Sequence, residues 1–448
     1  MRNSLVTRVR FGLSTALLVL SGAAQCAEDP FTKWAATHAL PVVTLEAGQD
    51  LVDLLPLKAV VGTTRVVALG EPTHGAHEPL AFRNRLVRFL VEQMGFTAIA
   101  LESGFTEAWG VDSFVGGGQG DAQDIVRKGL TSGFGRFAEN RELVQWMRDY
   151  NVAARAAGRR AIHFYGIDLT AGGRVSGPRR ALDSALAFLA RADADDASKF
   201  RTSMGDILPR SDDDQFGTLS PQAMAVLQSS VAAVAKAVAV NRSGLIARGS
   251  LHEYHWAVHN LEVARQLTRL FRVTPPASTS GPMMRDNGPQ IAARDYAMAQ
   301  NVRWAMDQEG PAGRIMVFAH NNHIMDWKEE GGIWANIREK PIMMGAQLRS
   351  VYGKDLLIIA TASATTSGGL PAPEALGESI DSTLMGVGLP TMILDLRAAR
   401  QEKAVFGWLS GQRALHANIS THVLITPSTA VDALFFVNRL TPAHIMAF

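Results

Sequence analysis

Short, mostly apolar runs alternate with longer stretches of helical periodicity in the first third of the chain. Val66–Leu69, Ala98–Leu101 and Ala161–Ile167 have the length and character expected of buried strands. The segments Glu78–Met94 and Glu139–Ala157 repeat apolar residues every three or four positions, which is typical of amphipathic helices. Strands that alternate with helices predict parallel β-α units and a sheet covered by helices.

The pattern changes between residues 178 and 308, where Ala, Leu, Val, Arg and Gln dominate and no strand pattern is visible. We therefore expect a mostly helical insertion here. A loop rich in Pro, Ser and Gly interrupts it at Thr274–Gly281. Strand patterns return at Arg314–Ala319 and Leu356–Ala360, whereas Thr361–Pro373 has the composition of a loop.

The remaining C-terminal part contains shorter runs, among them Thr391–Leu394 and His422–Ile425, and predicts a small α+β portion. The expected fold class is therefore α/β: a mostly parallel sheet with flanking helices, an inserted all-helical domain and a small α+β C-terminal portion. The expected segments are residues 28–177 for the first part of the α/β domain, 178–308 for the helical insertion, 309–360 for the second part of the α/β domain, and 361–448 for the small portion that completes the fold.

The N-terminal residues have the order of charge and hydropathy that is typical of an export signal. Three arginines lie within the first ten residues, the apolar stretch Phe11–Gly22 follows, and small residues precede the first acidic residue, Glu28. The apolar stretch is shorter than the ~20 residues that a membrane-spanning helix needs. Gln25 before Cys26 is a poor match to a lipoprotein signal. We therefore expect residues 1–27 to be a cleaved signal peptide, and the product to be periplasmic or secreted without a membrane attachment.

Composition changes the picture mainly by what it excludes. The chain has 448 residues, of which 47% are hydrophobic and 19% charged, and its formal net charge is +2, as in ordinary globular proteins. No basic block is interleaved with aromatic residues, so a nucleic-acid partner is not expected. Cys26 is the only cysteine, which leaves the expected mature chain without a disulfide or a thiol nucleophile. The glycines at Gly116–Gly118 lack the Lys-Ser/Thr pair that a phosphate-binding P-loop requires.

Titratable side chains follow the predicted strands at the positions where those strands end. In an open α/β sheet, ligands bind in the crevice beyond the carboxyl ends of the strands. Four predicted strands deliver carboxylates or imidazoles to this edge: Glu71 and His74 after the first, Glu102 after the second, Asp168 after the third, and His320 and His323 after the fourth. Each residue taken alone is more often a cap, a turn former or a structural hydrogen-bonding group, but their common placement indicates a catalytic site.

Arg83 adds a cation to this set. It shares a helix side with Leu86 and Leu90, and an arginine on the buried side of a helix needs an anionic partner such as the strand-end carboxylates. Arg85 and Arg88 are expected to project elsewhere. A histidine beside two carboxylates can act as a general base toward water, while a second histidine and Arg83 can stabilise an oxyanion or protonate a leaving oxygen. No G-x-S-x-G motif occurs, which disfavours a serine hydrolase and makes water the expected nucleophile.

Three groups of histidines raise the alternative of a metal-dependent hydrolase. They are the H-x-x-H pairs His74 with His77 and His320 with His323, and the helically spaced His252, His255 and His259. Neither pair has the H-E-x-x-H form of zinc proteases. The third group has the spacing of one helix face, which favours a structural role. We expect no metal and no other cofactor.

The run VVALGEPTHGAHEPLAFRNRLVRFLVEQMGFTAIALES resembles the defining region of the erythromycin esterase family, whose members carry a G-E-x-T-H-G loop, a following helix with an arginine, and a strand that ends in glutamate. Further matches, in the family's order, are ELVQWMRDYN at Glu142–Asn151, FYGID at Phe164–Asp168, RDYAMAQNV at Arg294–Val302 and FAHNNH at Phe318–His323. The resemblance spans roughly Leu55–Tyr352 and is weak after about Thr361. Pro72, where alanine is usual, and Asn322 are departures that touch no expected catalytic atom.

The resemblance implies a lactone or ester hydrolase that acts through water without a metal. It implies an α/β sheet domain, an inserted helical domain and a small α+β portion, with a cleft between them. It also implies that His74 is the general base and that the other matched positions belong to the same active site, namely Glu71, Glu102, Arg83, His320 and His323. Asp168 is expected to contribute to substrate binding.

Three interpretations of the function remain open. The first is a macrolide esterase that opens a large lactone, and the second is a hydrolase of the same fold that acts on another ester, such as a cell-envelope or natural-product ester. The third is a non-catalytic accessory protein of polysaccharide processing. Intact Glu71, His74, Glu102 and His320 argue against the third, because a pure binding module has no need of clustered titrating groups. The expected partner is a small-molecule ester or lactone.

Overall fold

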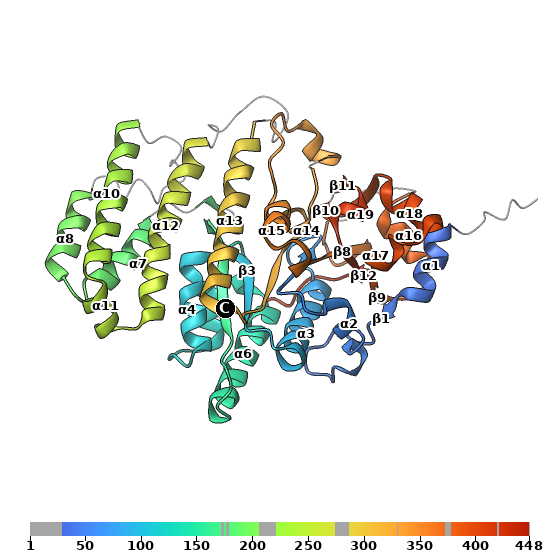
Figure 1. Ribbon diagram of the computed structural model, residues 1–448, viewed down its shortest axis with the longest axis horizontal. Coiled ribbons are helices and arrows are strands. Elements are labelled where there is room, and N and C mark those ends of the chain that lie inside the picture. Colours follow the sequence, from blue (N-terminus) through green and yellow to red (C-terminus); the bar gives the residue numbers. More distant parts are fainter. Residues whose placement is uncertain are drawn as a thin grey trace, which may run out of the picture.

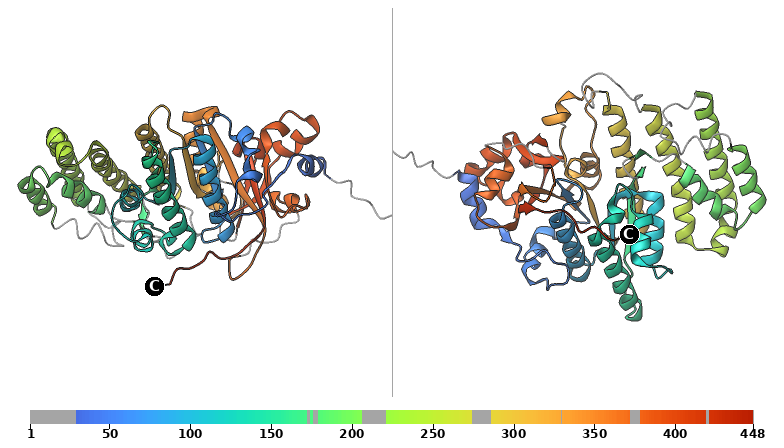
Figure 2. Two further views of the ribbon diagram at one scale, coloured as in Figure 1. Left: turned by 90° about the horizontal axis from the view of Figure 1, so that it is seen from below. Right: turned by 180° about the vertical axis from the view of Figure 1, so that it is seen from behind.

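The structure is a computed structural model that describes residues 29–171, 174–175, 179–205, 221–273, 286–328, 330–371, 378–418 and 421–447. The expected signal peptide at residues 1–27 and the expected loop Thr274–Gly281 lie outside the described residues. Figure 1 and Figure 2 show an elongated molecule, with a group of helices at one end, a sheet in the middle, and C-terminal helices beside α1 (Pro30–His38) at the other end.

An eight-stranded sheet forms the centre of the molecule, in the order β1-β9-β12-β8-β2-β7-β3-β4. Its strands are β1 (Leu40–Pro41), β2 (Val66–Glu71), β3 (Ala98–Gly104), β4 (His163–Asp168), β7 (Ile315–His320), β8 (Leu356–Thr366), β9 (Thr391–Asp395) and β12 (Ala433–Leu440). The strands from β12 to β4 run parallel, and β9 is antiparallel to both of its neighbours. The mostly parallel α/β fold expected from the sequence is confirmed.

The central strands are covered by helices, which explains their unbroken apolar character. Every residue of β2, β3 and β7 is buried, a pattern typical of parallel strands with both faces covered. Helix α3 (His77–Met94) follows β2 and contacts β2, β7 and β12, while α4 (Phe105–Val115) and α13 (Gly288–Glu309) contact β3 and β4. Helix α3 ends at Gly95, whose φ of +71° is the left-handed conformation that commonly terminates a helix.

A group of helices extends the molecule beyond α4 and α13 (Figure 1). They are α7 (Arg179–Leu189), α8 (Ala194–Ser203), α10 (Pro221–Val240), α11 (Arg242–Arg248) and α12 (Leu251–Val273). No strand occurs among the residues described between 179 and 287, which agrees with the helical insertion of the predicted fold class. In the described part of the chain no single helix meets the length and hydropathy needed to cross a membrane, and only the pair Met224–Val240 and Arg242–Arg248, bent by 71°, does so together.

The remaining elements lie around the sheet and in the C-terminal part. The helices are α2 (Leu57–Val61), α5 (Ala122–Gly129), α6 (Ala138–Ala156), α14 (Asn321–Ile324), α15 (Met344–Tyr352), α16 (Ile380–Met385), α17 (Leu396–Ala399), α18 (Lys403–Ser410) and α19 (Pro427–Ala430). Two small hairpins pair β5 (Thr170–Ala171) with β6 (Arg174–Val175) and β10 (Arg413–Asn418) with β11 (Thr421–Ile425). The C-terminal residues therefore contribute both a separate hairpin and two strands of the main sheet, β9 and β12.

The expectation of a loop at Thr361–Pro373 is wrong for its first half. Strand β8 continues to Thr366 and pairs with β12 over this extension. Its other neighbour, β2, pairs with β8 only as far as Ile359. The extension consists of small and β-branched residues (TASATT) and lacks the large apolar side chains by which the sequence pattern marks a buried strand, which is why the sequence predicted a loop.

Residues 441–447 run back from β12 across the start of α3, so that the chain ends far from the other C-terminal elements, as the trace to the end marked C in Figure 1 and Figure 2 shows. Three backbone hydrogen bonds of 2.8 Å hold this segment: His77 N–H to Thr441 O, Ala443 N–H to Gly75 O, and Ala138 N–H to His444 O. The segment therefore lies against the loop that follows β2 and against the start of α6.

Candidate active site

Strands β2, β3 and β7 end side by side and carry Glu71, Glu102 and His320. Glu71 is paired in register with His320 across β2 and β7. The pairing of β3 with β7 stops after Leu101, and the register of β3 shifts before Gly104, so Glu102 lies in an irregular part of its strand. There its Oε2 accepts the backbone N–H of His320 at 2.7 Å. The three side chains thus meet at the carboxyl edge of the sheet.

Gly70 allows the loop after β7 to approach β2 closely. A Cβ atom at Gly70 would lie 2.2 Å from Asn321 Oδ1 and 3.0 Å from the Asn321 Cα. The Asn321 amide is held in turn by Thr361, whose N–H donates to Oδ1 at 3.0 Å and whose carbonyl accepts from Nδ2 at 2.8 Å. This packing fixes the spacing between the ends of β2 and β7, and with it the spacing of the side chains that they carry.

His74 lies in the loop after β2 and is oriented by Glu71. Its Nδ1–H donates to Glu71 Oε1 at 2.6 Å, and its Nε2 lies 3.9 Å from Glu102 Oε1. The ring packs edge-on against Phe134 and His320, at centroid distances of 5.0 and 5.1 Å. The His74 side chain is 37% exposed, whereas that of Glu71 is fully buried. Nε2 is therefore the ring nitrogen that is available to water or to a substrate.

The charge state of His74 is set by the carboxylates around it. Burial alone would lower its pKa, but Glu71 and Glu102 outweigh this effect and raise the pKa of His74 to about 9. The imidazolium, paired with Glu71, is therefore the resting form at neutral pH. As a base, His74 acts in the fraction that has lost its proton, and that fraction grows as the pH rises toward 9.

Arg294 of α13 is the main cation of the cluster. Its Nη2 donates to Glu102 Oε1 at 2.7 Å, and its Nε and Nη2 donate to the two oxygens of Asp168 at 2.9 and 2.6 Å. Burial disfavours the charge, but Asp168 and Glu102 outweigh it and raise the pKa of Arg294. Burial also favours neutral Glu102, yet the charges of His323, His74 and Arg294 hold the pKa of Glu102 well below its usual value. Glu102 is therefore a carboxylate at neutral pH.

Asp168 and His323 both lie against Arg294. Asp168 is fully buried, and its oxygens accept from Arg294 and from the Leu169 N–H, so the geometry gives it the role of holding the guanidinium. His323 Nδ1–H donates to Asp295 at 2.9 Å, and its Nε2 lies 3.1 Å from Arg294 Nη1 and 3.4 Å from Glu102 Oε1. Burial disfavours its charge, but Asp295 and Glu102 outweigh this effect and raise the pKa of His323.

His320 is a buried imidazole next to His74. Burial and the charge of His74 lower the pKa of His320 well below its usual value, although Glu102 opposes this. Its Nε2 is buried and has no hydrogen-bond partner among the described residues. His320 therefore offers a neutral ring beside the imidazolium of His74.

Arg83 is fully buried within α3 and faces Glu71 without direct ion-pair contact. Its Nε and Nη2 donate to Asn84 Oδ1 at 3.1 and 2.7 Å, and its guanidinium lies 4.9 Å from the centre of the Phe318 ring. Burial lowers the pKa of Arg83 to about 10, against the attraction of Glu71, so the side chain stays charged at neutral pH. Arg83 Nη1 and Glu71 Oε2 are both buried without a hydrogen-bond partner in the described structure. Glu71, Glu139 and Glu142 are the carboxylates whose charges act on Arg83, and they provide the anionic surroundings expected for a buried arginine.

The other histidines considered in the sequence lie outside this cluster. His77 turns away from His74, and its Nδ1–H donates to Glu139 at 2.7 Å. The three histidines of α12 are bonded separately, His252 to Asp112 at 2.9 Å, His255 to Gln308 at 2.6 Å and His259 to Asn301 at 2.8 Å. Arg85 also lies elsewhere, in a buried ion pair with Asp53. The H-x-x-H spacing of His74 and His77 is therefore not a shared site.

Arg294 and Asp295 are site residues to which the sequence analysis assigned no role. They belong to the RDYAMAQNV match, but they lie in the span expected to be a helical insertion, and Arg294 is 192 positions away from Glu102. The sequence did contain a signal. Asp295 shares the buried face of α13 with Ala299, four residues on, and an ionisable residue on such a face marks a buried ion pair or a functional site.

The model of the erythromycin esterase family matches residues 91–440 of this chain. The match includes Glu102, His320 and His323, and it begins after the loop with Glu71 and His74. The chain is also 26% identical over 339 residues to the erythromycin esterase type II of Escherichia coli, an alignment that covers 74% of this chain and 77% of that protein. The resemblance seen in the sequence motifs is confirmed by these independent matches.

Two solved structures have the same fold. A Bacillus cereus protein is 24% identical, with a TM-score of 0.77 over 93% of this chain and 98% of its own. A mutant of the erythromycin esterase EreC in its open conformation is 18% identical, with a TM-score of 0.64 over 90% of this chain and 98% of its own. At these identities the structural matches bear on the fold alone, and the family assignment rests on the match over residues 91–440. By that match, the chain belongs to the erythromycin esterase family of hydrolases.

Proposed function

We propose that the protein hydrolyses a macrolide lactone, or a similar small-molecule ester, by general-base activation of water. The observation that carries this proposal is the orientation of His74. Glu71 holds Nδ1 at 2.6 Å, and Nε2 is left without a hydrogen bond among the described residues. A carboxylate on one ring nitrogen and a free second nitrogen is the arrangement used by histidine general bases.

In the proposed reaction, neutral His74 takes a proton from water at Nε2 while the water oxygen attacks the carbonyl carbon of the ester. The carbonyl oxygen becomes an oxyanion, and the ring becomes an imidazolium that Glu71 stabilises. The tetrahedral intermediate then collapses by breaking its bond to the leaving oxygen, which takes the proton from His74. The products are a carboxylic acid and an alcohol, and one water is consumed.

The remaining residues are assigned supporting roles. His320, with a neutral ring and an unpartnered Nε2 in the described structure, is assigned to the oxyanion or to the leaving oxygen. Arg294 keeps Glu102 ionised. Arg83 supports the charge of Glu71 from within α3, which makes it a positioning residue because its guanidinium is buried.

The macrolide part of the proposal rests on the names of relatives, since the E. coli protein to which the chain is 26% identical is an erythromycin esterase. The direct test is to incubate the purified protein with a panel of macrolides, simple lactones and aryl esters, and to follow the products by mass spectrometry. Addition of one water to a macrolide supports the proposal. Hydrolysis of other esters alone overturns the macrolide assignment, and hydrolysis of nothing in the panel by folded protein overturns the esterase assignment.

The proposal includes export, which rests on the order of charged, apolar and small residues within residues 1–27. N-terminal sequencing of the protein from its natural host tests this part. We expect the mature protein to begin between Gln25 and Glu28. An intact Met1 in the exported fraction contradicts cleavage.

A further inference from the structure

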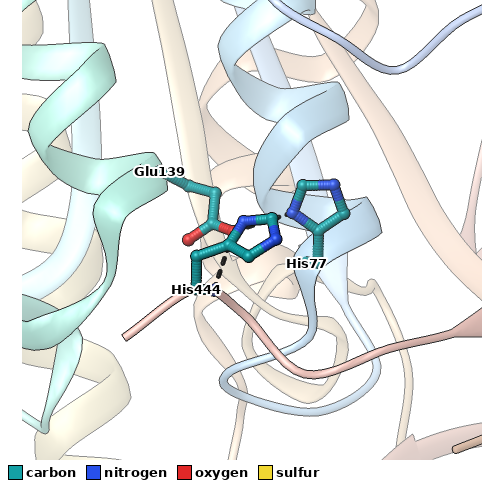
Figure 3. A group of neighbouring side chains, drawn as sticks. All are labelled: His77, Glu139 and His444. Carbon is teal, nitrogen blue, oxygen red and sulfur yellow. Dashed lines mark hydrogen bonds and ion pairs between the residues drawn. The ribbon is translucent and has the colours of Figure 1, made fainter. Parts of the chain in front are cut away.

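A second group of titratable side chains lies three residues beyond His74, on the other side of the loop. His77 at the start of α3, Glu139 at the start of α6 and His444 in the 441–447 segment point toward one another, as Figure 3 shows. None of these residues has a place in the proposed hydrolysis. They come from three parts of the chain that are far apart in sequence, and the fold brings them together.

The geometry of this group is that of a small ligand set. His77 Nδ1 lies 2.7 Å and His444 Nδ1 lies 2.9 Å from the same oxygen, Glu139 Oε1. One ligand atom from each residue lies within 4.8 Å of both others. In a tetrahedral zinc site with bonds of about 2.0–2.2 Å, neighbouring ligand atoms are about 3.3 Å apart. Each Nδ1 atom therefore needs to move only about half an ångström away from Glu139 Oε1 to leave room for an ion.

The carboxylate of Glu139 is buried and only partly hydrogen-bonded. Its side chain is 2% exposed, and its Oε2 is buried with no hydrogen-bond partner among the described residues. His77 Nδ1, at 2.7 Å, and the His444 backbone N–H, at 3.0 Å, both donate to Oε1, and no donor among the described residues reaches Oε2. A buried carboxylate oxygen without a partner is costly, and a bound cation is one of the ways in which proteins offset that cost.

The surroundings of the group favour a positive charge. Glu46 Oε1 lies 3.7 Å from His77 Nε2, and Glu78 and Glu46 both act on His77 electrostatically. Glu142 acts on Glu139 in the same neighbourhood. A carboxylate near the far nitrogen of a ligating histidine is the usual second partner of such a ligand, because it accepts the proton that remains on the ring.

We propose that His77 Nδ1, His444 Nδ1 and the Glu139 carboxylate bind one divalent transition-metal ion, with zinc as the best match. Two imidazoles and one carboxylate are ligands that zinc accepts, and a water molecule completes the tetrahedron. On binding, Nδ1 of each imidazole coordinates the ion and the ring keeps one proton on Nε2; a ring that was an imidazolium releases its Nδ1 proton to solvent. This site departs from the expectation of a protein without metal, but it is separate from the strand-end cluster and leaves the metal-free hydrolytic step unchanged.

A bound ion would fasten the 441–447 segment to the loop that carries His74. The segment pairs with Gly75 on one side and with the start of α6 on the other, next to Phe134 and the His74 ring that it contacts. His444 is the ligand on the segment itself and has a 70% exposed side chain. The metal would therefore be structural. Its removal would destabilise the packing of residues 441–447 more than that of the central sheet.

In another carboxylate–imidazole group, Asp112 with His163 and His252, one ligand atom from each residue also lies within 4.8 Å of both others. Its carboxylate oxygens are already in use, because Oδ1 accepts from His163 and from the Phe164 N–H while Oδ2 accepts from His252. No unpartnered oxygen remains there, so this group carries no proposal. It provides the matched control for the experiment.

The test uses the purified full-length chain, stripped with a chelator and titrated with zinc chloride by calorimetry, with elemental analysis of the desalted product. We expect one equivalent of zinc and a thermal midpoint raised by about 2 °C or more at saturating zinc. His444→Ala should weaken binding by more than about tenfold, whereas His252→Ala should bind zinc as the wild type does. His444→Gln serves as the second variant if His444→Ala does not fold.

Cobalt(II) gives an independent readout, because a four-coordinate site produces intense visible absorption bands. We expect these bands in the wild type and in His252→Ala, and their loss in His444→Ala and His77→Ala. Absence of stoichiometric zinc binding overturns the proposal. Loss of zinc in His252→Ala with retention in His444→Ala also overturns it, since the ion would then lie at Asp112. These experiments measure zinc binding and not hydrolysis. Their outcome is therefore independent of whether the proposed hydrolytic function is correct.

Discussion

Two groups of carboxylates and imidazoles in this protein differ in how completely their atoms are bonded. In the Asp112 group, both carboxylate oxygens accept hydrogen bonds, and His163 and His252 are each bonded to one of them. In the strand-end cluster, Glu71 Oε2, Arg83 Nη1 and His320 Nε2 are buried without a hydrogen-bond partner among the described residues. The first group is satisfied and the second is not.

Exposure does not separate the two groups. The side chains of His163 and His252 are 34% exposed and that of His74 is 37% exposed. The two groups differ in whether buried polar atoms without a hydrogen-bond partner lie near the imidazole rings. The fully bonded cluster joins α4, β4 and α12. Unpartnered buried polar atoms need another partner, and in a cluster that contains a partly exposed histidine a substrate is one such partner.

The largest effect expected from this difference is on catalysis. Replacing His74 by Asn should lower kcat by about 10²–10⁴-fold, because the general base is lost. The thermal midpoint should change little, since the side chain is partly exposed and its loop is also held by backbone bonds to residues 441–447. Turnover and melting are measured on the same preparation. A variant that melts normally and turns over at the wild-type rate would rule out His74 as the base.

The next largest effect should come from Arg294. Replacing it by Ala leaves the buried carboxylates of Glu102 and Asp168 without their cation, and breaking a buried pair in this way typically costs about 3–5 kcal/mol. Chemical denaturation measures the free energy of unfolding. Arg294→Lys is the control, because it keeps the positive charge but loses the bidentate hydrogen bond to Asp168. A loss of less than about 1 kcal/mol in the Ala variant contradicts the role given to Arg294.

The pH profile separates His74 from His320 as the base. The pKa of His74 is raised to about 9, so its neutral form and hence kcat/KM should rise about tenfold per pH unit from pH 7 and level off near pH 9. The pKa of His320 is lowered well below its usual value, so a reaction with His320 as base would be flat over the same range. A flat profile in a stable protein therefore transfers the role of base to His320.

The smallest effect is expected in the satisfied group. His252→Asn removes one partner of Asp112 and should lower the free energy of unfolding by about 1.5–3 kcal/mol, the usual contribution of a hydrogen bond to a charged group. Hydrolysis per folded molecule should stay unchanged. If His252→Asn reduces turnover as His74→Asn does, the contrast between the two groups is wrong.

The sequence predicts much of the fold and part of the site for one physical reason. Parallel strands end at a common edge, so residues that follow apolar runs come together, and Glu71, Glu102 and His320 do so. The contribution of Arg294 depends on how α13 packs on β3 and β4, and no local periodicity encodes that contact. The divergence of His74 and His77 depends on the path of a loop, which H-x-x-H spacing does not specify.

The return of residues 441–447 to the loop after β2 has a consequence for biosynthesis. Thr441 is bonded to Glu78, 363 positions earlier in the chain. During translation, residues 441–447 are therefore synthesised long after the loop that carries His74 and against which they pack. Contacts of such long sequence separation form late and slow folding. The nascent chain thus passes through a period in which its sheet can begin to assemble while this loop still lacks its last neighbours, a stage at which chaperones and proteases can compete for it.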